Sequence, residues 1–324
     1  MKTKINLILF IGLILLIGCN YSREKENIER KEIAVLKYVT HPALDELENA
    51  YVNRLDSLLK TSDSLKGYYI KKYNANASST SANTIAKSFE HKNIVLILTI
   101  GTPAAIEVAN INSDIFHLYG AVADPLGAKI IPSKRSTGIQ NSGESIIREA
   151  LVFIKTTFGQ QVKIGTIYNP KEQNSIYVQG LIKKIGLELG LSIKQVTTES
   201  TSQLNGITNS LCSEVDVIYS ANDNTVNSGV TTITSVTSQY KKPFIIGDLS
   251  TLKDGALFAI GLKYSTMGNE LADMSYRVIL ENSIQSFPPQ RPPKAEIWIN
   301  EKVRKELGFN LSDSIKVKFK IKMN

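Results

Sequence analysis

The chain has 324 residues, of which 42% are apolar and 21% are charged, and its formal net charge is +8. These values are typical of a soluble globular protein with one large domain or two of ordinary size. The basic residues are scattered and form no aromatic-rich basic module, so we expect no nucleic-acid partner. Cys19 and Cys212 are too few for a disulfide framework.

The amino-terminal segment is typical of an export signal. Two lysines precede a nearly unbroken apolar run at 5–17, which fits a signal-peptide core and is short for a membrane span. The run ends in Leu-Ile-Gly-Cys at 16–19, which resembles a bacterial lipobox. That resemblance implies removal of 1–18 and anchoring through lipid on Cys19, since several acyl chains together give stable attachment. The alternative is an uncleaved anchor, and in either case 19–31 is predicted to be a flexible tether.

Beyond the tether, apolar runs alternate with helical patterns, which predicts parallel sheets flanked by helices. A first set of strands is predicted at 32–38, 68–73, 94–100 and 117–121. A second set is predicted at 163–168, 192–196, 216–220, 244–247, 256–261 and 296–299. One helix is predicted to end near residue 60, and others are predicted at 81–89, 143–158, 173–189, 203–211, 227–240, 267–281 and 301–307.

This repetition predicts an α/β fold of two Rossmann-like lobes with parallel sheets. We assign 32–140 and 248–283 to lobe 1, and 141–247 and 284–324 to lobe 2. Several crossings between the lobes should bring strand carboxyl ends from both sides around one cleft. Clefts between domains are favoured ligand sites.

The corner after the third predicted strand carries the clearest local signal. An apolar run at 94–100 suits a strand buried on both faces. Gly101 and Thr102 then turn the chain, and Pro103 fits the first position of a helix. Thr102 is predicted to cap this helix with its hydroxyl. A helix amino terminus at this edge of a sheet is a seat for a carboxylate or phosphate, although most such corners bind nothing.

Polar residues follow several other predicted strands, and each alone is more often a cap or turn residue than a ligand contact. Together they offer anion seats, cation partners and amides, the combination that an amino acid zwitterion requires. They are His41, Asp124, Asn174, Ser175, Asp223, Asn224 and Asp248. The sequence has no histidine pair at metal-ligand spacing, no P-loop, no GxGxxG and no GxSxG. We therefore expect no metal, no cofactor and no catalytic residues.

An ordered series of short motifs resembles one family. The motifs are His41-Pro42-Ala43-Leu44-Asp45, Thr102-Pro103-Ala104-Ala105, Ala123-Asp124-Pro125, Tyr168-Asn169-Pro170 with Asn174-Ser175, Asp223-Asn224-Thr225-Val226, Gly247-Asp248, and Gly255-Ala256-Leu257 with Gly261. In this order they resemble the ABC transporter substrate-binding family that includes tryptophan- and tyrosine-type binding lipoproteins. The similarity extends over roughly residues 32 to 310.

The resemblance implies a type I periplasmic-binding-protein fold whose lobes close over a solute, most often an aromatic or large apolar amino acid. It implies a separate permease and ATPase as partners, an extracytoplasmic location and, we expect, a monomer. Carried onto this chain, it implies a ligand-binding set of His41, Leu44, Thr102, Pro103, Ala104, Asp124, Asn174, Ser175, Asp223, Asn224 and Asp248.

Within that set the resemblance implies different partners for the parts of an amino acid. The turn at 102–104 would hold the ligand carboxylate, with help from the pair at 174–175. Asp223 or Asp248 would pair with the ammonium, and His41 and Leu44 would line the side-chain pocket. At the first crossing between lobes, members of this family usually have a hydrophobic or acidic residue after a Thr-Gly pair. This chain departs from that pattern, because Gln140 and Asn141 follow Thr-Gly-Ile at 137–139.

Two other functions remain open at this stage. The same clamp could be a sensor that docks on a membrane receptor, and the sequence does not separate sensing from import. A surface hydrolase on a similar scaffold is the third possibility, which the missing nucleophile and base disfavour.

Overall fold

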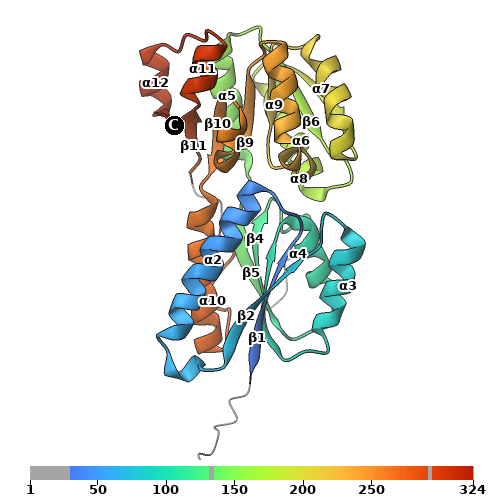
Figure 1. Cartoon of the computed structure of the whole chain (residues 1–324), viewed down its shortest axis with the longest axis vertical. Coiled ribbons are helices and arrows are strands. Elements are labelled where there is room, and N and C mark those ends of the chain that lie inside the picture. The colour runs from blue at the N-terminus through green and yellow to red at the C-terminus, as the bar shows by residue number, and fades with distance from the viewer. Residues whose placement is uncertain (1–29, 131–134, 291–293, 324) are drawn as a thin grey trace, which may run out of the picture. The chain divides into compact units, whose positions relative to one another are not determined.

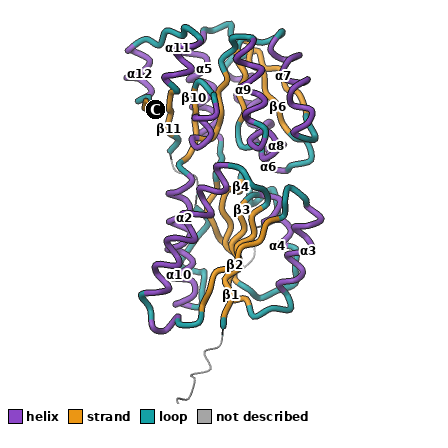
Figure 2. Tube along the Cα trace, in the orientation of Figure 1, coloured by secondary structure: helices purple, strands orange, loops and turns teal. Residues whose placement is uncertain are grey.

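The computed structural model describes residues 30–130, 135–290 and 294–323, of which those from 31 onward belong to one compact unit. The predicted signal peptide, Cys19 and the tether up to residue 29 lie outside the described residues. Figures 1 and 2 show two layered bodies in the described part, each with strands between helices. Within these ranges, no helix is both long enough and apolar enough to cross a bilayer.

The first lobe contains a five-stranded parallel sheet in the order β2-β1-β3-β4-β5. Its strands are β1 (Lys31–Lys37), β2 (Tyr68–Asn74), β3 (Ile94–Ile100), β4 (Phe116–Val122) and β5 (Ser136–Gln140). The prediction missed β5, whose sequence STGIQ carries no apolar run. It pairs in parallel with β4 and closes that edge of the sheet.

Helices cover both faces of this sheet. Figure 1 shows α2 (Pro42–Lys60) and α10 (Tyr264–Glu281) on one side, and α3 (Ser79–Phe89) and α4 (Thr102–Ala109) on the other. The two pairs pack helix against helix. A short 3-10 turn, η1 (Asp63–Leu65), leads from α2 to β2. The central β3 is buried over most of its length, as its apolar run predicts.

The second lobe contains a seven-stranded sheet in the order β12-β11-β10-β9-β8-β6-β7. The strands are β6 (Lys163–Tyr168), β7 (Ser192–Thr197), β8 (Val217–Ser220), β9 (Phe244–Asp248), β10 (Phe258–Leu262), β11 (Glu296–Ile299) and β12 (Lys322–Met323). Adjacent strands are parallel except at the β10–β11 pair.

Two apolar clusters cover the two faces of this sheet. One cluster includes α5 (Glu144–Phe158), α6 (Gln173–Glu188) and the carboxyl-terminal α11 (Glu301–Glu306) and α12 (Asp313–Phe319). The other includes α7 (Leu204–Cys212), α8 (Asn224–Ser228), α9 (Val230–Gln239) and η3 (Leu249–Asp254), while η2 (Thr201–Gln203) leads into α7. No element was predicted beyond residue 307, where the basic carboxyl-terminal segment forms α12 and β12.

The lobe boundaries differ from the prediction in two places. Residues 248–283 were predicted in lobe 1, but β10 pairs with β9 and β11 in the second sheet. The chain returns to the first lobe only at α10, which packs along α2. Ile284 and Phe287, assigned to lobe 2, lie in the first-lobe core. Sequence patterns mark β10 as a strand without indicating which sheet it joins.

Candidate functional site

The loops that follow the parallel strands of the two lobes contact each other. His41, after β1, places its Nε2 3.3 Å from the side-chain oxygen of Asn224, after β8. In addition, α2 contacts η3, and α4 contacts α6. Residues from both lobes therefore meet at the sheet edge where ligands bind in open parallel sheets.

On the first lobe, the corner after β3 differs from its prediction in one detail. The N-cap of α4 is Gly101, with φ of 100°, and no side chain caps the helix. Glycine is favoured there because this φ is strained for residues with a Cβ. Thr102 instead lies in the first turn of α4, and its Oγ1 accepts a hydrogen bond of 3.3 Å from the amide of Ala123 after β4. The predicted hydroxyl cap is wrong, and the hydroxyl joins two loops instead.

Four other predicted residues of this lobe pack in its core or cap a local turn. Leu44 and Ala104 are buried in the first-lobe core, and Pro103 is buried in the first turn of α4. Asp124 is half-buried and accepts a 2.9 Å hydrogen bond from the amide of Gly127, so it caps its own turn. None of these side chains makes a described hydrogen bond to the second lobe.

On the second lobe, Asp223 joins two loops. Its Oδ1 accepts from the amide of Val226 at 2.7 Å, which caps α8. Its Oδ2 accepts from the amide of Asn169 and the hydroxyl of Ser175, both at 2.7 Å. Burial, followed by the nearby charge of Glu172, raises the pKa of Asp223 to about 6. Both oxygens of this carboxylate are thus already engaged within the protein.

Glu172 is a central residue of the site that the sequence analysis missed. It is 4% exposed, and its Oε1 accepts from the amide and hydroxyl of Thr225 at 3.1 and 2.8 Å. Its Oε2 accepts from the amide and side chain of Asn224 at 3.2 and 2.6 Å, and from the side chain of Asn174 at 3.3 Å. The only local signal is its position in the loop between Asn169-Pro170 and Asn174.

Asp248 differs from Asp223 because one of its oxygens is free of partners. Its Oδ1 accepts from the amide and hydroxyl of Ser250 at 2.9 and 2.8 Å. Its Oδ2 is buried and has no hydrogen-bond partner among the residues that the structure describes. Burial raises the pKa of Asp248 to about 6. Burial, followed by the charge of Asp248, raises the pKa of Tyr264.

A chain of amides continues from the hinge into this cluster. The side chain of Asn141 donates to the hydroxyl of Tyr264 at 3.1 Å. The carbonyl oxygen of Asn141 accepts from the side chain of Asn222 at 3.2 Å, and the carbonyl of Asn222 accepts from Asn174 at 2.9 Å. Hydrogen bonds thus link the first crossing between lobes to Asn174 in the first turn of α6.

Several buried polar atoms on these loops have no partner within the described residues. They are His41 Nδ1, Asn141 Oδ1, Ser142 Oγ, Asn174 Oδ1, Ser220 Oγ and Asp248 Oδ2. Burial lowers the pKa of His41 to about 4, so its ring is neutral near pH 7. Because buried polar groups are normally hydrogen-bonded, such a set marks a site for a polar ligand or ordered water.

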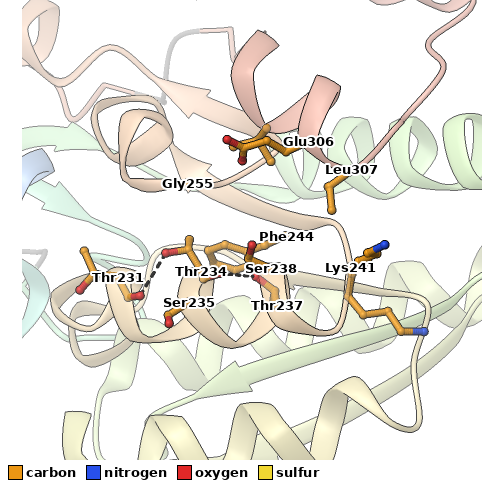
Figure 3. A pocket seen from close by; sticks show the side chains of 12 residues that line it. Thr231, Thr234, Ser235, Thr237, Ser238, Lys241, Phe244, Gly255, Glu306 and Leu307 are labelled. Atoms are coloured by element: carbon orange, nitrogen blue, oxygen red, sulfur yellow. Dashed lines mark hydrogen bonds between the residues drawn. The ribbon is translucent and has the colours of Figure 1, made fainter.

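A cavity of about 280 Å³ lies beside this cluster, between the lobes. Its walls include Tyr38, Val39, Ala77, Glu172, Asn224 and Thr225. A second cavity, of about 320 Å³, lies on the second lobe between α9 and α11 (Figure 3). Hydroxyls of α9 line it, and several of them bond to their own helix backbone. It shares no residue with the predicted ligand-binding set.

Comparisons with known proteins agree with this architecture. A curated relative, the tyrosine-binding protein of Clostridioides difficile (strain R20291), is 27% identical over 322 residues, which is 95% of this chain and 92% of the relative. A conserved domain protein from Vibrio cholerae superposes with a TM-score of 0.84 at 24% identity, covering 91% of this chain and 100% of that one. An ABC domain in complex with L-Trp from Streptococcus pneumoniae gives 0.81 at 23% identity, with the same coverage of both chains.

The solved structures confirm the predicted fold, which is that of type I periplasmic binding proteins. The family model described as ABC transporter substrate binding protein matches residues 32–321. Proteins of this family bind small solutes outside the cytoplasm without catalysing a reaction on them. The match spans nearly the whole described chain, and the protein therefore belongs to the family of ABC transporter substrate-binding proteins.

Proposed function

We propose that this protein captures an aromatic or large apolar amino acid outside the cytoplasm and delivers it to an ABC permease and its ATPase. One observation carries the proposal: buried polar atoms without partners lie on loops of both lobes, at the edge where the sheets meet. The printed name of the curated relative refers to tyrosine, and the Streptococcus structure contains L-Trp. Both support an amino acid of this class.

The proposed roles follow from which groups are still available. The amino terminus of α4, with Thr102, Pro103 and Ala104, would hold the ligand carboxylate, since free amides and the helix dipole favour an anion there. Asn174 and Ser175, at the start of α6, would assist from the second lobe. His41 and Leu44 would lie near the ligand side chain.

For the ligand ammonium, the structure favours Asp248 over Asp223. Three donors of the protein already occupy the oxygens of Asp223. The Oδ2 of Asp248 is buried and unpartnered. A buried carboxylate oxygen without a donor is unfavourable in the empty site and would gain a charge-assisted hydrogen bond on binding.

Capture would proceed by hinge closure of the two lobes, as in other two-lobed binding proteins. The lipobox at 16–19 would tether the closed protein near its permease through lipid on Cys19.

A thermal-shift screen of the twenty amino acids tests the proposal. The protein would be a soluble form that begins at Asn20. A ligand at 100 times its dissociation constant should add about 2.7 kcal/mol to the free energy of unfolding. We expect the largest shifts with L-tyrosine, L-tryptophan or large apolar amino acids. No shift with any of the twenty would contradict an amino acid as the solute.

A further inference from the structure

Asn141 occupies a junction between the lobes that the predicted ligand-binding set does not include. It directly follows β5, where the chain first leaves the first lobe. Its side chain donates to the hydroxyl of Tyr264, the first residue of α10, where the chain has returned to that lobe. Its carbonyl oxygen accepts from Asn222 on the second lobe. One residue thus contacts two connecting segments and a loop of the second lobe.

The free end of this side chain is an acceptor. The hydrogen bond from Nδ2 to Tyr264 orients the amide and leaves Oδ1 buried without a partner. Asn141 as a whole is only 7% exposed. A buried amide oxygen without a donor is unfavourable, and native proteins rarely retain one without a ligand or water to satisfy it.

Two other unpartnered acceptors belong to the same network. Asn174 Oδ1 is linked to Asn141 through Asn222. Asp248 Oδ2 belongs to a residue that pairs with Leu262 between β9 and β10, two residues before Tyr264. All three atoms are buried oxygens. The two amide oxygens can only accept hydrogen bonds, and the same holds for the carboxylate oxygen while Asp248 is ionised. A primary ammonium offers three N–H donors and one positive charge, and it matches this set in both number and sign.

We propose that Asn141 Oδ1 accepts a hydrogen bond from the ligand ammonium, with Asp248 as its counter-charge and Tyr264 as the residue that positions the amide. Asn141 thereby selects solutes that carry a primary amine. This inference rests on the proposed binding function and specifies which chemical group the site requires.

The experiment compares three kinds of probe, each made with a phenol ring and with an indole ring, that differ only in their charged groups. L-tyrosine and L-tryptophan carry both charged groups, tyramine and tryptamine lack the carboxylate, and 3-(4-hydroxyphenyl)propionate and indole-3-propionate lack the ammonium. Isothermal titration calorimetry at pH 7 measures each dissociation constant for the soluble protein and for Asn141→Ala. Asn83→Ala serves as a control, since that amide bonds to Glu107 between α3 and α4, within the first lobe.

We expect Asn141→Ala to weaken the amines about tenfold or more, as loss of a hydrogen bond to a charged group does, and to leave the amine-free acids nearly unchanged. Asn83→Ala should change neither class. Equal weakening of amines and amine-free acids in Asn141→Ala would overturn the inference, as would an amine-free acid that binds the wild type as tightly as its amino acid.

Tyr264→Phe provides a second variant if Asn141→Ala disturbs the hinge. It keeps the ring and removes only the hydroxyl that holds the amide, so the preference for amines over amine-free acids should fall with Asn141 still present. An unchanged preference would contradict the positioning role of Tyr264.

The results also separate this inference from the proposed function. Binding of tyramine or tryptamine that depends on Asn141, without binding of either amino acid, would support the inference and contradict amino acid capture. Amino acid binding that Asn141→Ala leaves unchanged would support amino acid capture and contradict the role proposed for Asn141. Binding of no amine at all would contradict both.

Discussion

At the scale of single residues, the two buried aspartates of the second lobe differ in how many of their oxygens already have partners. Asp223 and Asp248 are each 1% exposed, and burial raises the pKa of each to about 6. Donors of the protein surround Asp223, whereas Asp248 keeps one oxygen without a partner. The two aspartates therefore have similarly raised pKa values, but only Asp248 has a carboxylate oxygen that is open to a ligand donor.

Replacing Asp248 with Asn should weaken amine binding and yet stabilise the ligand-free protein at pH 7. The pKa of Asp248 rises to about 6 in the folded state, from the ordinary aspartate value of 3.8. Between these values the folded protein binds more protons than the unfolded chain. The stability contributed by protonation is thus complete below about pH 4 and lost as the pH rises through about 6. At pH 7 the buried charge costs up to about 3 kcal/mol.

Urea unfolding of the wild type and Asp248→Asn at several values between pH 4 and pH 7 measures this effect. The variant should gain up to about 3 kcal/mol at pH 7 and little at pH 4. His41 and His117, whose pKa values burial lowers to about 4 and about 3, act in the opposite direction, but they are present in both proteins and cancel in the difference. Asp56→Asn, at a surface ion pair, is the control. A variant that is less stable at pH 7 would contradict this account.

At the scale of elements, the site is held by side chains that join loops. Asp223 connects the loop after β6 to the start of α8. Glu172 holds the first residues of α8 from the same loop. On the first lobe, Thr102 connects the corner after β3 to the end of β4. These contacts position the loops before any ligand arrives, which lowers the entropic cost of binding.

Asp223→Ala should therefore act on stability more than on ligand selectivity. It leaves three buried donors, on Asn169, Ser175 and Val226, without their acceptor. We expect the free energy of unfolding to fall by about 2–4 kcal/mol. Urea unfolding without ligand measures this loss. Asp124→Ala, which caps only its own turn, should cost about 1 kcal/mol or less.

Calorimetry in conditions where Asp223→Ala is folded gives the decisive comparison. The variant should still prefer amines over amine-free acids. If Asp223→Ala lost that preference and Asp248→Asn kept it, the ammonium would pair with Asp223, the other assignment that the sequence allows.

Elements with strong local signals could be predicted from the sequence, and contacts between loops could not. The apolar run of β3 and the Gly-Thr-Pro corner located a buried strand and a helix start. The choice of Gly101 rather than Thr102 as the cap depends on a backbone angle of 100°, which the residue types alone do not fix. The role of Glu172 arises from contacts with residues more than fifty positions away, so no local pattern marks it.

At the scale of the whole molecule, loops of two covalently linked lobes meet at the candidate site. The arrangement was predictable because two rounds of strand and helix patterns follow each other. The exact crossing points were not, because β10 joins the second sheet through hydrogen bonds to β9 and β11. The helix that follows it, α10, packs in the first lobe against α2. Residues at these crossings, such as Asn141 and Tyr264, therefore contact both the hinge and the site.

The proposed lipid anchor can be tested on the whole chain. Its two cysteines provide a matched pair of variants, Cys19→Ala and Cys212→Ala. Cys19 ends the lipobox motif, whereas Cys212 is fully buried on α7. Expressed in a bacterium that processes lipoproteins, the wild type and Cys212→Ala should incorporate radiolabelled palmitate and sediment with membranes. Cys19→Ala should incorporate none, because the thiol that accepts the diacylglycerol is missing.

Sodium carbonate extraction then separates the two kinds of anchor. A lipidated protein with several acyl chains should stay with the membrane through the wash. If the wild type carried no label, resisted extraction and kept the size of the full precursor, the segment at 5–17 would be acting as an uncleaved anchor and the lipobox assignment would be wrong. Amino acid binding by the soluble form would be the same in either case, because that form begins after Cys19.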